Sequence, residues 1–184
     1  MENRAHGESR DERLRRFQDN PPTEAIGTLL NSVANFFNNE IAITPNNSQT
    51  SLLFLGIHAA ALTISEVFFD KSGVEGYKLF LEKFVDGDSD DTKFSIIADL
   101  IHDWRNVLAH QWLGSVGHKI GYDYVMRLGW EVRDGITYIN PKIYCEHYLK
   151  PFSSNGKMWD FLSMFSASEL EDIKSRIIKK YLER

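Results

Sequence analysis

The sequence predicts a mainly α-helical protein, an antiparallel helical bundle with one inserted β-hairpin. Apolar residues recur every three to four positions along most long segments, which is the spacing of an amphipathic helix. One later segment alternates between apolar and polar residues around an Asp-Gly turn, as a hairpin does. The chain has 184 residues, of which 42% are hydrophobic and 26% are charged, so it can bury a sizeable core.

The first part of the chain, 1–20, is predicted to be a charged N-terminal segment, followed by a single helical domain over 21–184. A short charged helix over 8–19 ends at the Pro21-Pro22 pair, because proline interrupts helical hydrogen bonding. This segment lacks the apolar stretch of a signal peptide. The net charge of −5 argues against a strongly basic nucleic-acid-binding domain, although a local basic patch can still contact RNA.

The next predicted helices supply much of the core. Helical spacing first appears in "TEAIGTLLNSVANFFNNEIAI", residues 23–43. After a loop rich in turn formers, Ser48 or Thr50 caps a long apolar helix that ends near Asp70. That helix contains His58 and several small polar residues, so we expect a buried core helix and no membrane span. A further short helix is predicted from "VEGYKLFLEKFV", residues 74–85.

The helix that carries the candidate site is predicted over 92–112. Asp91 or Thr92 starts this helix, and Gly114 and Gly117 end it. Its apolar residues share one side, as a stripe that faces a core requires. They are Phe94, Ile97, Ile101, Trp104 and Leu108.

A β-hairpin is predicted at about 122–139, inserted among the helices. Apolar and charged residues alternate in "YVMRLGWEVRDGITYIN", and Asp134-Gly135 supplies the turn. Beyond the hairpin, two short helices are predicted on either side of Pro151. A last helix follows, capped by Ser166 or Ser168.

The two sides of this hairpin differ in chemistry. We expect the apolar side to pack on the helices, because an isolated hairpin is only marginally stable. Its members are Leu128, Trp130 and Val132. The other side carries Arg127 and Arg133, with Lys119 nearby, and these three cations are candidates for contacting RNA phosphates.

The stretch "DWRNVLAHQW", residues 103–112, carries the candidate catalytic residues. Arg105 and His110 are separated by four residues, and Asn106 directly follows the arginine. Metal-independent RNA cleavage can use the ribose 2′-hydroxyl as the nucleophile. It then needs a group that moves a proton and a fixed positive charge beside the phosphoryl oxygens. Histidine and arginine suit these two tasks.

The spacing of the motif also sets a geometric condition. On an ideal helix Arg105 and His110 lie about 140° apart around the axis, so they do not point at one spot within one chain. Asn106 and His110 are four residues apart and can touch, so Asn106 can fix the orientation and tautomer of the histidine ring.

The segment "RNVLAH" resembles the signature of the HEPN superfamily, in which an arginine is followed after four to six residues by a histidine. The resemblance implies an all-α bundle that forms a homodimer, so that two motif helices line a shared cleft. It also implies a metal-independent endoribonuclease without cofactors, often from bacterial defence or toxin–antitoxin systems. By this resemblance Arg105 would stabilise the phosphate, His110 would act as acid or base, and Asn106 would orient the site. The hairpin is no part of the minimal bundle.

The remaining histidines and the single cysteine predict no further catalytic or metal site. We expect His58 to be a core residue and His102, one turn before the motif, to face solvent, although it could line the same cleft. Cys145 and His147 lack companion ligands for zinc. A single cysteine forms no disulfide within the chain, which fits a reducing cytoplasm. Glycine-rich phosphate loops and a dinucleotide-binding fingerprint are absent from the sequence.

The preferred prediction is a cytoplasmic, homodimeric ribonuclease that acts on RNA, and two other functions stay open. One is a non-catalytic HEPN-like module that dimerises or binds a protein partner such as an antitoxin. The other is a small-ligand binder with a pocket near Trp104 and Trp112.

Overall fold

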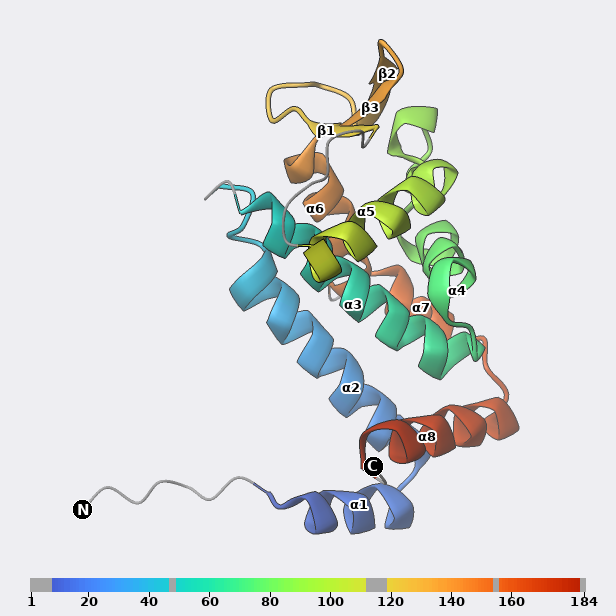
Figure 1. Ribbon diagram of the computed structural model, residues 1–184. Helices are drawn as coiled ribbons and strands as arrows, with labels where there is room; N and C mark the ends of the chain where they lie inside the picture. The colour runs from blue at the N-terminus through green and yellow to red at the C-terminus, as the bar shows by residue number, and fades with distance from the viewer. Residues whose placement is uncertain (1–7, 47–48, 112–118, 154–155, 183–184) are drawn as a thin grey trace, which may run out of the picture. The chain divides into compact units, whose positions relative to one another are not determined.

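The protein is mainly helical, with eight α-helices and one three-stranded sheet among the residues that the structure describes (Figure 1). The structure is a computed structural model that describes residues 8–46, 49–111, 119–153 and 156–182, without the side chains of His110 and Gln111. The predicted ends of the motif helix at Gly114 and Gly117 lie outside these residues, as does Ser48. The chain divides into two compact units. Unit 1 comprises residues up to 32 together with those from 164 onward, and unit 2 comprises 33–163.

The helices of unit 1 begin at well-formed caps. The Ser9 hydroxyl accepts a hydrogen bond from the Glu12 amide, and the Glu12 carboxylate accepts one from the Ser9 amide. Ser166 and Glu169 form the same reciprocal pair at the last helix, so the predicted Ser166 cap is confirmed. The elements are α1 (Arg10–Asp19), the first part of α2 (Pro22–Phe36) and α8 (Ala167–Tyr181).

Hydrogen bonds join the two ends of the chain within unit 1. Arg10 Nε donates to the Leu182 carbonyl at 2.7 Å, and Lys174 Nζ donates to the Asn20 carbonyl at 2.8 Å. The predicted boundary at residue 20 therefore falls inside this unit, beside groups that pair with α8. A single domain over 21–184 stays a prediction.

In unit 2, α3, α4 and α5 pack against one another, and the sheet lies at one end near α6 (Figure 1). Turns of 3-10 and π type extend or precede several of these helices. The elements are η1 (Phe37–Ile41), α3 (Thr50–Phe69), α4 (Gly73–Phe80), η2 (Leu81–Val85), η3 (Asp90–Thr92), η4 (Phe94–Ile97), α5 (Ala98–Gln111), β1 (Ile120–Tyr122), β2 (Trp130–Arg133), β3 (Ile136–Ile139), α6 (Pro141–Leu149), η5 (Lys150–Phe152) and α7 (Lys157–Leu162).

The long apolar helix α3 is the core helix of unit 2. By length and composition it could cross a membrane, but 56% of its most apolar window is buried inside the protein, as in the core helix of a soluble protein. The predicted cap at Thr50 is wrong, because Gln49 occupies the N-cap position and makes no side-chain bond to the helix. The Thr50 hydroxyl instead hydrogen-bonds to the Tyr124 hydroxyl, a tertiary contact. Asp70 ends the helix in the left-handed conformation, at φ 53°.

The motif helix begins later than predicted. The start predicted at Asp91 or Thr92 is wrong, because two 3-10 turns precede α5, which begins at Ala98. Hydrogen bonds between two aspartate side chains and backbone amides account for this later start. The Asp91 carboxylate accepts from the Gly129 amide at 3.1 Å, and the Asp86 carboxylate accepts from the Ser95 amide at 3.0 Å.

The predicted hairpin is confirmed as β2 and β3, but it spans 130–139 and not 122–139, and it belongs to a sheet of three strands. Asp134 and Gly135 form its turn with positive φ angles of 52° and 75°, which match the twist of the strands. Strand β1, which the alternation does not indicate, pairs parallel to β3. The predicted packing of the apolar side is wrong for two of its three members, because only Trp130 is half-buried, whereas Leu128 is 41% exposed. Val132, near the turn, is 59% exposed.

Candidate active site

Arg105 is a partly buried cation with no anionic partner among the described residues. It projects from α5, and its Nη1 donates to Asn106 Oδ1 at 3.0 Å. Its Nε is buried and has no hydrogen-bond partner among the described residues. No carboxylate of the described chain forms an ion pair with it. Because buried charges are normally paired, this guanidinium is suited to an anion from a ligand or a second chain.

Asn106 is placed to orient the arginine. The prediction gave Asn106 the task of holding His110, but the contact that the structure describes is with the Arg105 guanidinium. The backbone of His110 lies in the last turn of α5. Its side chain lies outside the described residues, so the predicted Asn106–His110 contact is neither confirmed nor contradicted.

Two histidines that the motif does not include lie beside Arg105. His58 on α3 and His102 on α5 share a hydrogen bond of 2.9 Å between Nε2 and Nδ1. His58 is fully buried, which confirms its prediction as a core residue. The prediction that His102 faces solvent is only half right, because it is half-buried and bonded to His58. The sequence held one signal for this pair, since a histidine within an apolar helix needs a polar partner.

Both histidines are held in the neutral form. Burial lowers the pKa of His58 to about 3, and the nearby His102 and Arg105 add to this shift. Burial is also the largest cause of the lowered pKa of His102. Arg105 lowers that pKa further, whereas Asp103 and Asp99 act in the opposite direction. Neutral imidazoles beside an arginine can donate hydrogen bonds without adding to the positive charge.

Aromatic residues fix α5 to its neighbours on the other side. The Trp104 indole donates to the Tyr122 hydroxyl of β1, and Tyr122 in turn packs on Phe54 of α3 with ring centroids 5.2 Å apart. Trp104 therefore serves the packing between α5 and the sheet. Trp112, the second residue of the predicted small-ligand pocket, lies outside the described residues.

The three cations predicted to contact RNA differ in their surroundings. Arg133 is committed to local partners: it pairs with Asp123 at 2.7 Å and Glu131 at 2.8 Å. Its guanidinium also lies 4.5 Å from the centre of the Tyr138 ring. Arg127 is exposed and precedes β2, so it does not share a strand with Arg133 as predicted. Lys119 is exposed directly before β1.

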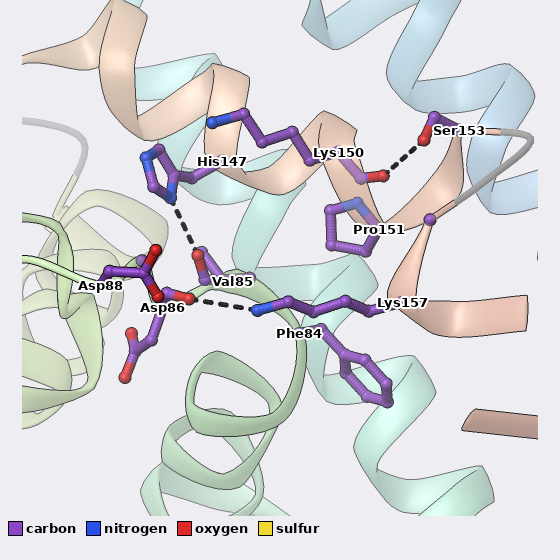
Figure 2. Close-up of a pocket in the computed structure, with 11 residues that line it drawn as sticks. Phe84, Val85, Asp86, Asp88, His147, Lys150, Pro151, Ser153 and Lys157 are labelled. Carbon is purple, nitrogen blue, oxygen red and sulfur yellow. Dashed lines mark hydrogen bonds between the residues drawn. The ribbon is translucent and has the colours of Figure 1, made fainter. Parts of the chain in front are cut away.

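A cavity of about 400 Å³ lies elsewhere in unit 2, and none of the motif residues lines it (Figure 2). Two of its polar side chains are hydrogen-bonded to backbone carbonyls. His147 Nδ1 donates to the Val85 carbonyl at 2.9 Å, and Lys157 Nζ donates to the Asp86 carbonyl at 3.3 Å. We place the candidate site at Arg105, which belongs to the motif, and not in this cavity.

Comparison with protein-family models, with curated proteins and with solved structures found no match for this chain. The described residues contain no group of three His, Cys, Asp or Glu side chains that could hold a metal ion. The chemistry of the candidate site therefore has to be argued from the side chains around Arg105.

Proposed function

We propose that this protein is a metal-independent endoribonuclease of HEPN type that acts as a homodimer. The observation that carries the proposal is the partly buried Arg105, oriented by Asn106 and without a carboxylate partner among the described residues. A phosphodiester supplies the anion that such a guanidinium lacks, and arginine binds phosphoryl oxygens through two parallel donors. The antiparallel bundle and the cytoplasmic location belong to this proposal as well.

The reaction needs only groups that the chain and the RNA provide. The ribose 2′-oxygen forms a bond to phosphorus while the bond to the 5′-oxygen of the next nucleotide breaks. His110 takes the proton from the 2′-hydroxyl or gives one to the leaving 5′-oxygen. Arg105 stabilises the negative charge that grows on the phosphoryl oxygens. The products are a 2′,3′-cyclic phosphate end and a 5′-hydroxyl end.

A second copy of the chain completes the proposed site. On an ideal helix Arg105 and His110 diverge by about 140°, so one chain does not aim both at the same phosphate. Two α5 helices that meet across a two-fold axis would place the arginine of one chain opposite the histidine of the other. The proposed biological role is that of a toxin or phage-defence nuclease, restrained by an antitoxin protein.

The direct test is cleavage of labelled RNA by the purified protein in the presence of EDTA. We expect cutting that leaves 2′,3′-cyclic phosphate ends. His110→Ala and Arg105→Ala should each lower the rate by about 100-fold or more while the fold survives by circular dichroism. Arg133→Ala is the matched control, because that arginine already has two carboxylate partners. Cleavage that requires a divalent metal, or that persists in His110→Ala, would rule out the mechanism.

The alternative, a non-catalytic interaction module, is favoured by one observation of its own. An apolar groove on unit 2 is lined by Phe36, Leu55 and the well-exposed Ile43 and Leu52, which are 52% and 49% exposed. Exposed apolar side chains that adjoin in this way are typical of protein-binding surfaces. Under this alternative the wild-type protein cuts no RNA, and Leu52→Glu lowers the mass measured by light scattering to that of a monomer.

A further inference from the structure

Of the two histidines beside Arg105, one is fully buried and the other is partly exposed. His58 is fully buried, with its ring 4.4 Å from the ring of Tyr77, so it touches neither solvent nor ligand. His102 is only half-buried. The bond between them joins residues 44 positions apart in the chain, at 2.9 Å. Because this bond uses Nδ1 of His102, the atom left for a ligand is its Nε2.

His102 lies close to Arg105 on the helix surface. It precedes Arg105 by three residues and Asn106 by four, which places it between them around the axis, about 60° from the first and about 40° from the second. His110 is about 140° from Arg105 by the same geometry. Of the two histidines on α5, His102 is therefore the nearer to the direction of Arg105. Asp99 and Asp103 are the charged residues of α5 that oppose Arg105 in their effect on this ring.

The unpartnered nitrogen of His58 decides where the shared proton lies. If His102 donated to His58, a neutral His58 would carry its proton on Nδ1, which is buried without a partner among the described residues. If His58 donates instead, only a lone pair at Nδ1 stays unpaired. Orphaned buried N–H groups are rarer than under-satisfied acceptors. His58 therefore donates from Nε2, His102 accepts at Nδ1, and the outer Nε2 of His102 carries a proton.

We infer that His102, positioned by His58, is a second functional histidine of this site, which binds the substrate by donating its Nε2–H to a phosphoryl oxygen held by Arg105. The inference rests on the proposed function for its substrate class, a phosphodiester of RNA. A neutral imidazole can polarise an oxygen by donating a hydrogen bond without giving up its proton. The lowered pKa values of both rings fit this task, because a ring that stays neutral keeps the arrangement across the pH range near 7. His102 and His110 thus have different tasks, donation and proton transfer.

Two variants of similar shape test whether His102 acts as a hydrogen-bond donor or as an acid–base group. His102→Gln places an amide N–H₂ near the former Nε2 and keeps a donor for the phosphate. His102→Asn places its amide near the former Nδ1, keeps the contact with His58 and leaves no donor at the outer position. We expect His102→Gln to cleave RNA within about threefold of the wild type and His102→Asn to be slower by about 30-fold or more. The affinity for an uncleavable 2′-O-methyl RNA, measured by fluorescence anisotropy, should fall about tenfold in His102→Asn only.

The binding measurement keeps this inference distinct from the proposed nuclease. If the wild type binds the 2′-O-methyl RNA through His102 but cuts no RNA, the nuclease proposal fails and the inference stands. If RNA is cut and His102→Asn behaves as the wild type, the nuclease stands and the inference is overturned. Equal defects in both variants also overturn it, because they show that the imidazole itself is needed. Absence of both cutting and binding in the wild type overturns the two together.

Nitrogen-15 NMR of the histidine rings tests the positioning role of His58 without activity. We expect Nδ1 of His102 to be unprotonated and its Nε2 protonated. His58→Gln, which can still donate to His102, should preserve this tautomer, and His58→Phe should lose it. A His102 ring that shows a proton on Nδ1 in the wild type would overturn the assignment.

Discussion

Two buried polar clusters lie side by side in unit 2. They differ in how many of their polar atoms have a hydrogen-bond partner. In the first, the hydroxyls of Tyr77, Tyr144 and Tyr148 bond to one another at 2.5, 3.0 and 3.3 Å, so each has two partners. In the second, around His58 and Arg105, two buried nitrogens have none among the described residues. The clusters meet where the His58 ring packs on the Tyr77 ring.

The difference is the one we expect between a structural network and a functional one. The tyrosine cluster closes on itself, so nothing from outside is needed to satisfy it, and its removal should affect stability alone. The cluster around Arg105 has an unused donor, an unused acceptor and a charge without an ion-pair partner among the described residues, as we expect where a ligand or partner supplies the missing groups. Changes of pH and single substitutions can test whether this contrast holds.

Mild acid should lower the stability of the protein, because unfolding lets the buried His58 ring take up a proton. The folded-state pKa of His58 is about 3, below the unfolded value of about 6.5, so its contribution to stability is present above pH 6.5 and is lost as pH falls toward 3. We expect the free energy of unfolding to drop by about 2 kcal/mol between pH 7.5 and 5 through this group. Urea denaturation at each pH measures this drop in the free energy of unfolding. His102, whose pKa is lowered too, acts in the same direction.

His58→Gln is the control for this acid effect. Glutamine does not titrate, so the variant should lose most of the decline between pH 7.5 and 5 whatever its stability at pH 7.5. Most carboxylates titrate below this window, which isolates the histidines. An unchanged decline in His58→Gln would show that the buried ring is not its source.

Removal of one hydroxyl from the tyrosine cluster should lower stability and leave RNA cleavage unchanged. Tyr77→Phe deprives Tyr144 and Tyr148 of one partner each inside the core. We expect a loss of about 1–2 kcal/mol in the free energy of unfolding. Tyr138→Phe is the matched control, since its hydroxyl has no hydrogen bond among the described residues, and its effect should stay below about 0.5 kcal/mol. A cleavage defect in Tyr77→Phe would show that the two clusters work as one.

The smallest expected effect concerns the exposed cations near the sheet. Arg127 is exposed, whereas Arg133 is neutralised by Asp123 and Glu131. If the RNA crosses this surface, Arg127→Ala should weaken binding about threefold and reduce the salt dependence by about one phosphate contact. Arg133→Ala should change the affinity less. Equal losses in both variants would show that the ion pairs of Arg133 open when RNA binds.

Local patterns in the sequence were enough to place most of the helices. Apolar spacing predicted α2, α3 and α4. The Ser166 cap and the Asp134-Gly135 turn were predicted correctly because each depends on neighbouring residues alone. The start of α5 was missed because the carboxylate of Asp91 accepts from the distant Gly129 amide and does not cap a helix, and the Asp86 carboxylate accepts from the Ser95 amide. Strand β1 was missed because three residues are too few to show alternation.

The sequence by itself determined a mainly helical chain and the placement of Arg105 and Asn106 one after the other on an amphipathic helix. Only the tertiary structure decided what surrounds them, because the packing of α3 on α5 is what brings His58 to His102. No spacing along the chain encodes that contact, since its partners belong to two helices. The same packing leaves Arg105 partly buried with no carboxylate partner in the described part of the chain, and this, more than the spacing of the motif, makes it the centre of the candidate site.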